Sequence, residues 1–169
     1  MTESQKLPEF QESQESQKLP QSQELRLKKA EKEDLLILLE LYTYLHNNPM
    51  PALNRHIENT WAEIMQNPNH HILLGFLDEK LISSCIITVI PNLTHHQRPY
   101  ALIENVITHP AYRNKGHAST LLAAAKNIAI ENNCYKIMLM NGSKLESTLD
   151  FYRRAGYNSN DKTAFIQWL

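Results

Sequence analysis

The chain has 169 residues, of which 42% are hydrophobic, 17 are basic and 18 are acidic, so its formal net charge is −1. This size and apolar content suit a globular domain, and the near-neutral charge argues against a protein that binds nucleic acid by neutralising phosphates. The longest mostly apolar run, Leu81 to Ile90, is too short to span a bilayer. No signal peptide is recognisable, and Cys85 and Cys134 do not form a disulfide framework. We therefore predict a reduced cytoplasmic protein that does not enter membranes.

The first 24 residues differ from the rest of the chain. Gln, Glu and Ser dominate them, and the sequence ESQKLP occurs twice, at residues 3–8 and 15–20. Such a segment buries too little apolar surface to offset the entropy that ordering would cost. We predict a disordered tail over residues 1–24 and a single domain over residues 25–169.

The first part of the domain is predicted to contain a short strand, two helices and a hairpin. A short strand at 25–27 is followed by an amphipathic helix over about 31–46, which the prolines of NNPMP end, and by a second helix over 54–65. The runs HILLGFL and KLISSCIITVI then predict an antiparallel hairpin with a short polar turn, closed by Pro91.

From residue 100 the predicted order is strand, loop, helix, strand, helix, strand. ALIENVIT is a central strand, an apolar stripe from Ala118 predicts a helix that ends at the NN pair, and YKIMLM is the next strand. Ser147 and Asp150 resemble the capping box of a further helix, and Gly156 suits its left-handed end. TAFIQWL predicts a last strand. These elements indicate an α+β, or mixed α/β, domain built on one central sheet.

The stretch YRNKGHAST places Gly116 between cationic residues and the start of a helix. At such a strand-to-helix connection, backbone N–H groups and the helix N-terminus form an anion site, and a glycine lets a phosphate approach closely. Arg113 and Lys115 add positive charge, with His117 as a third candidate. Taken alone, Arg-x-x-Gly is more often an ordinary solvated loop, and it is neither a Walker loop nor Gly-x-Gly-x-x-Gly.

The chain resembles the GCN5-related N-acetyltransferase (GNAT) family through VITHPAYRNKGHASTLL, YKIMLMNGS and FYRRAGY. The family's acetyl-CoA loop, Arg/Gln-x-x-Gly-x-Gly/Ala, is matched by Arg113, Gly116 and Ala118. The resemblance implies a splayed, mostly antiparallel sheet flanked by helices, acetyl-CoA as co-substrate, direct transfer of acetyl to an amine, and no metal. Many members carry an Asn seven residues before the family's tyrosine, and Leu145 stands there instead.

The resemblance also implies which residues bind the co-substrate. The backbone of Val106, Ile107 and Thr108 would pair with the pantetheine arm, and Asn141 would add a polar contact from the end of the next strand. The pyrophosphate would be held by the loop and first helical turn, at Arg113, Asn114, Lys115, Gly116, His117, Ala118 and Ser119.

Amine acetylation requires two proton movements. Tyr152 matches the family's general acid, and a phenol with a pKa of about 10 can protonate a leaving thiolate whose conjugate acid lies near ~8.5. Without the resemblance, Tyr152 beside Phe151 would be read as a packing residue. Glu104 interrupts an apolar central strand, where an ionised carboxylate is costly unless it is paired or takes part in chemistry. We predict Glu104 as the base and Asn105 on the opposite face; the alternative is a structural Glu104, either paired with a buried Arg or facing a wet splay of the sheet.

The eight histidines lack the i, i+4 spacing of a helical zinc site, and only His109 and His117 flank the cationic loop. IENVITHPAYRNKG and NCYKI also resemble the amino-sugar phosphate acetyltransferases, so the expected partner is a small-molecule amine with amino sugars as candidates. Family resemblance further implies a homodimer. The alternatives are a non-catalytic acyl-CoA-binding sensor or scaffold, and a protein whose tail recruits partners.

Overall fold

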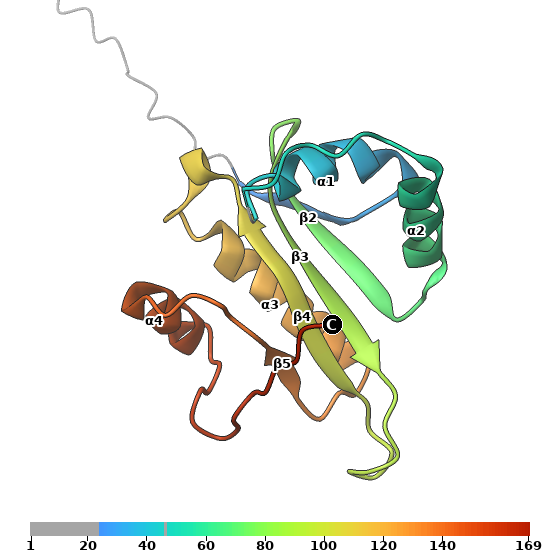
Figure 1. Cartoon of the computed structure of the whole chain (residues 1–169). Coiled ribbons are helices and arrows are strands. Elements are labelled where there is room, and N and C mark those ends of the chain that lie inside the picture. Colours follow the sequence, from blue (N-terminus) through green and yellow to red (C-terminus); the bar gives the residue numbers. More distant parts are fainter. Residues whose placement is uncertain (1–23, 46) are drawn as a thin grey trace, which may run out of the picture.

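The computed structural model describes residues 24–45 and 47–169 (Figure 1), so the predicted tail lies almost wholly outside the described residues. Short 3₁₀ turns at Lys32–Asp34 and Pro110–Tyr112 precede two of the helices. The helices and strands, in chain order, are β1 (Arg26–Lys29), α1 (Leu35–Tyr42), α2 (Arg55–Gln66), β2 (His70–Leu77), β3 (Lys80–Ile90), β4 (Tyr100–Thr108), α3 (His117–Glu131), β5 (Ile137–Leu139) and α4 (Glu146–Arg154).

The strands form one sheet in the order β1-β2-β3-β4-β5. The first four strands pair antiparallel, and β5 joins β4 in parallel. Because β5 pairs only with Ala101–Ile103, at the beginning of β4, the two strands separate beyond that point. The predicted α+β fold, a splayed and mostly antiparallel sheet flanked by helices, is confirmed.

Helices cover both faces of the sheet. Side chains alternate along β2 and β3, so each strand places apolar residues on both faces. On one face, Leu73, Cys85 and Ile87 pack with the apolar stripe of α3. On the other, Leu74 and Ile86 pack with residues of α1 and α2. Figure 1 shows α1 and α2 on one side of the sheet and α3 on the other, and we call these the α1 face and the α3 face.

Three local predictions were wrong. The segment 163–169 forms no strand, and Phe165, Trp168 and Leu169 are exposed. Alternating apolar residues favour a strand, but a strand also needs a neighbour with which to pair. The first helix ends at Tyr42 rather than near residue 46. Ser147 lies within α4, whose N-cap is Leu145.

The end of α4 was predicted correctly, since Gly156 follows it with φ of +91°. Both cysteines are free thiols, with Cys85 buried and Cys134 partly buried. Within residues 24–45 and 47–169, no helix has the length and apolar character needed to cross a membrane.

We expect the fold to lose stability in alkaline solution. Burial is the main cause that raises the pKa of Tyr42 from 10.0 to about 12 and that of Cys85 from 9.0 to about 12. Since both groups release their protons earlier in the unfolded chain, the free energy of unfolding should fall between about pH 9 and pH 12. Thermal melts across this range test the expectation, and Cys85→Ala should flatten the slope at its lower end. A melting temperature constant to pH 12 would contradict it.

Candidate active site

The distal part of β4 leaves one backbone edge open. From Glu104 to Thr108, β4 pairs with β3 on one side, with Ile86 opposite Glu104 and Ser83 opposite Thr108. On the β5 side this segment has no strand partner among the described residues. An unpaired strand edge presents N–H and C=O groups that an extended ligand can engage. Val106, Ile107 and Thr108, the predicted pantetheine residues, all lie on this edge segment.

A bulge interrupts β4 within the same segment. Ser84 lies opposite Ile107, whereas Ile86, two residues on, lies opposite Glu104, so β4 contains one extra residue there. Asn105 adopts a left-handed conformation with φ of +50°.

Glu104 shares the α1 face with Ile86, its partner across the strand pair. The side chain of Asn105 lies near the hydroxyl of Tyr42, which packs on that same face. The prediction that Asn105 points to the opposite face from Glu104 was therefore wrong, because a bulge breaks the alternation of side chains.

The loop after β4 leads directly into the N-terminus of α3. Gly116 is the N-cap of α3 with φ of +84°, and Asn114 is also left-handed, with φ of +62°. A Cβ at Gly116 would meet no atom within 4 Å beyond those of the adjoining chain, so the space beside this backbone is open. The first N–H groups of a helix have no intrahelical acceptor, which applies here to His117, Ala118 and Ser119. This arrangement is suited to an anion.

Cationic side chains surround the loop. Arg113 Nε donates to the Thr108 carbonyl at 3.1 Å, which ties the loop to the end of β4. The Nζ atoms of Lys80 and Lys115 lie 5.2 and 5.7 Å from the centre of the Tyr112 ring. Lys80 was not identified from the sequence, because it is the first residue of β3, far from the loop in sequence.

Two histidines at the loop are held neutral. His109 Nδ1 accepts from the Ala111 N–H at 3.2 Å, and its ring packs edge-to-face against Tyr44 at 4.7 Å. Burial, Lys80 and Arg113 lower the pKa of His109, while burial and then Lys115 lower that of His117. The charge near the loop therefore comes from lysine and arginine, and His117 is not a third cation.

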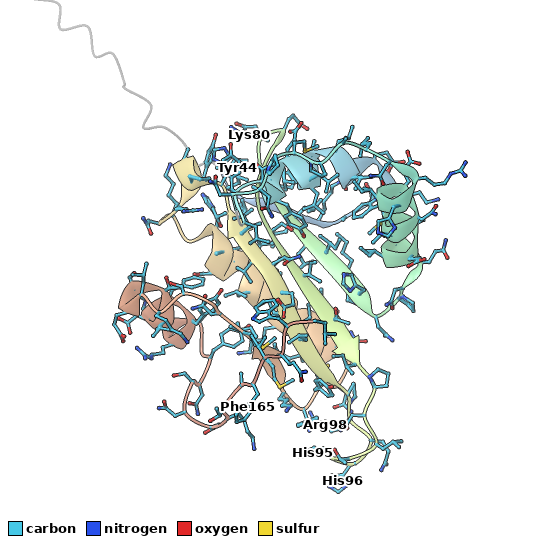
Figure 2. All side chains as sticks on the ribbon, in the orientation of Figure 1. Tyr44, Lys80, His95, His96, Arg98 and Phe165 are labelled. Carbon is cyan, nitrogen blue, oxygen red and sulfur yellow. The ribbon has the colours of Figure 1, made fainter. Side chains whose placement is uncertain are left out.

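Figure 2 shows Tyr44 and Lys80 at one end of the sheet, and His95, His96 and Arg98 at the other. The second group belongs to the connection between β3 and β4. Arg98 donates there to the carbonyls of Asn133 and Cys134, at 3.1 and 3.0 Å. Lys80 and the basic residues of the β3–β4 connection thus lie at opposite ends of the sheet.

Asn141 lies just beyond the end of β5, as predicted. Its amide nitrogen donates to the Ser143 carbonyl at 2.9 Å, and its amide oxygen accepts from the Ser143 N–H at 3.3 Å. The side chain is thus engaged in a local turn, and a ligand contact would have to compete with that turn.

Tyr152 lies half-buried on α4 and packs against the α3-face core. Its ring contacts those of Phe151, at 4.8 Å between centroids, and Tyr157, at 6.1 Å. Burial, then Cys85, then Glu104 raise the pKa of Tyr152 above its ordinary value of 10.0. The structure thus brings the predicted acid and base within electrostatic reach of each other, from α4 and β4.

Tyr157 is a neighbour that sequence reasoning missed. Burial, Cys85 and Tyr152 raise its pKa to about 12. FYRRAGY places Tyr157 close to Tyr152 in sequence, but only the fold shows that both phenols approach Cys85.

Comparison with known proteins agrees with this geometry. The model of the acetyltransferase (GNAT) family matches residues 33–157. A glucosamine 6-phosphate N-acetyltransferase of Trypanosoma brucei brucei is 26% identical over 144 residues, which span 82% of this chain and 92% of that protein.

Solved structures give the same result. An acetyltransferase from Agrobacterium tumefaciens str. C58 is 31% identical with a TM-score of 0.79, covering 85% of this chain and 99% of that one. A Trypanosoma brucei acetyltransferase, 23% identical with a TM-score of 0.73 over 86% of this chain and 100% of that one, shows the same fold. The chain therefore belongs to the GNAT family and is an N-acetyltransferase.

Proposed function

We propose that this protein transfers the acetyl group of acetyl-CoA directly to the primary amine of a small molecule. The observation that carries the proposal is the continuous path from the open edge of β4 to the left-handed Gly116 at the start of α3. An extended pantetheine arm fits an unpaired strand edge, and a pyrophosphate fits a helix N-terminus flanked by Arg113 and Lys115. These residues thus suit acetyl-CoA.

Two side chains of this chain would move the protons. Glu104 accepts a proton from the substrate ammonium, since an alkylammonium with a pKa near ~10.4 has no free lone pair at neutral pH. Tyr152 donates a proton to the sulfur of the leaving thiolate. Its raised pKa keeps the phenol protonated, as an acid requires.

The acceptor class is proposed from similarity. The relative of 26% identity is named for glucosamine 6-phosphate, so amino sugars are the first candidates. The test combines acetyl-CoA with a panel of primary amines that includes glucosamine 6-phosphate, and follows the release of free thiol. Absence of thiol release with every amine would refute the enzymatic proposal. The homodimer and the cytoplasmic location stay predictions.

Gly116→Val is expected to abolish acetyl-CoA binding. A side chain there would fill the open space beside the backbone, and a β-branched residue resists a φ of +84°. Acetyl-CoA at about 100 times its dissociation constant should stabilise the wild-type protein by roughly 2.7 kcal/mol, or about 5–10 °C in a thermal melt. The variant should show no such shift.

Gly156→Val is the matched control for this experiment. Gly156 is also left-handed, with φ of +91° and open space around it, but it lies beyond α4 and away from the loop. Both variants should lose roughly 1–3 kcal/mol through backbone strain, and only Gly156→Val should keep the shift caused by acetyl-CoA. An undiminished shift in Gly116→Val would place the phosphates elsewhere.

A further inference from the structure

Two hydroxyls are buried on the α1 face beside the bulge of β4. Neither Tyr42 Oη nor Ser84 Oγ reaches standard hydrogen-bond geometry with any group in the described residues. A buried hydroxyl without a partner destabilises a fold, whereas phenylalanine or alanine would bury similar apolar surface without that cost. The stability of the free protein therefore does not explain these two hydroxyls.

The Tyr42 hydroxyl reaches both strands that form the bulge. Tyr42 is the last residue of α1, and its hydroxyl lies near the side chains of Ser84 on β3 and Asn105 on β4, without a hydrogen bond to either. Ser84 is fully buried, and it lies opposite Ile107, where the register is still regular. The Tyr42 hydroxyl thus lies between Ser84, on the regular side of the bulge, and Asn105, within the bulge.

Asn105 directly follows Glu104, so its conformation sets the direction of the preceding residue. A left-handed φ of +50° is uncommon outside glycine, and it needs support from the surroundings. A bulge redirects the side chains beside it, here including Glu104. We propose that Tyr42 is a positioning residue, whose hydroxyl engages Asn105 when substrate binds and thereby aims the Glu104 carboxylate at the acceptor amine.

This inference rests on the proposed function, because it assigns Tyr42 as a positioning residue for Glu104, the proposed base. Hydrogen bonds that serve catalysis are often long or poorly aligned in a free enzyme and tighten when substrate binds. The ring of Tyr42 also lines a cleft of about 230 Å³, formed with Thr43, Pro49 and Pro51 at the end of α1. A small molecule bound in this cleft would lie against Tyr42, next to the bulge.

The kinetic test is a double-mutant cycle of Tyr42→Phe and Glu104→Gln. Thiol release is measured with the most active amine of the panel. Tyr42→Phe should lower kcat about 10- to 100-fold, as expected for a misplaced catalytic group, and leave the Kd of acetyl-CoA unchanged. In the Glu104→Gln background, Tyr42→Phe should cause no further loss, because both changes act on one base. Tyr100→Phe, the same substitution at the far end of β4, should keep wild-type kcat.

A stability measurement tests the same inference without activity. Ser83 is the matched control, because it neighbours Ser84 and is equally buried, yet its Oγ donates to the Ile107 carbonyl at 2.8 Å. Ser83→Ala should lower the melting temperature by several degrees. Tyr42→Phe and Ser84→Ala should leave it unchanged or raise it. A drop in Tyr42→Phe as large as that in Ser83→Ala would make the hydroxyl a structural group and overturn the inference.

The outcomes separate this inference from the proposed function. Wild-type kcat in Tyr42→Phe, or losses that add in the double variant, would overturn the positioning role of Tyr42. If Glu104→Gln is impaired in the same experiment, the role of Glu104 as base still stands. A fully active Glu104→Gln, or a wild-type protein that releases no thiol with any amine, would overturn both.

Discussion

Tyr152→Phe is expected to lower kcat roughly 100-fold or more while acetyl-CoA still binds with wild-type affinity. The substitution removes only the hydroxyl, so the packing of the ring against Phe151 and Tyr157 is kept. Loss of a general acid typically costs between about 10² and 10⁴ in rate, whereas loss of an exposed or packing hydroxyl leaves turnover nearly unchanged. Steady-state kinetics and a binding isotherm for acetyl-CoA together make the measurement.

The pH profile gives this variant a second signature. The pKa of Tyr152 is raised above 10.0, so the wild-type rate should fall on the alkaline side as the phenol loses its proton. This limb should vanish in Tyr152→Phe. Tyr157→Phe is the control, because it removes a neighbouring phenol from the same cluster and should keep both the limb and most of the rate. If Tyr157→Phe were the impaired variant, the acid would have to be reassigned to Tyr157.

Glu104→Gln is expected to lower kcat/KM by about 10²- to 10⁴-fold at neutral pH. Glutamine keeps the shape of the side chain but cannot accept the proton of an ammonium. The rate should partly recover at high pH, where the amine is already deprotonated in solution. Rates measured from pH 6 to pH 10 with one amine test both points.

Glu63→Gln on α2 controls for the loss of one negative charge from the molecule. Glu63 is exposed, and its replacement should leave the rates unchanged across this pH range. Wild-type rates in Glu104→Gln across the whole range would leave Glu104 as a structural residue. The acetyl-CoA site could survive that result, since it depends on the edge of β4 and on Gly116.

Most of the fold was predictable because its signals are local. Pro91 and the polar turn at Asp78 and Glu79 mark the ends of strands, and the stripe that includes Leu121, Leu122 and Ala125 marks α3. The strand expected at 163–169 failed for the opposite reason, since pairing depends on a distant neighbour. The length of α1 was overestimated because apolar spacing continues past the residue at which the helix ends.

The candidate site was predictable where a residue type is unusual for its place. Gly116 after a cationic run and Glu104 within an apolar strand both stand out in the sequence. The bulge at Asn105 did not, because an extra residue becomes visible only when β4 is paired with β3. Lys80 and Tyr42 were missed for the same reason, since each reaches its neighbours from another element.

Tryptophan fluorescence can report on the exposed C-terminal segment, because Trp168 lies within it. The chain has two tryptophans. Trp61 is buried on α2 and donates its indole N–H to the Lys32 carbonyl, whereas Trp168 is 88% exposed. Their fluorescence should therefore separate into a blue-shifted, shielded component and a red-shifted one open to soluble quenchers. Binding of another chain or a ligand over residues 163–169 should therefore alter only the second component. No added fluorescent label is needed to detect it.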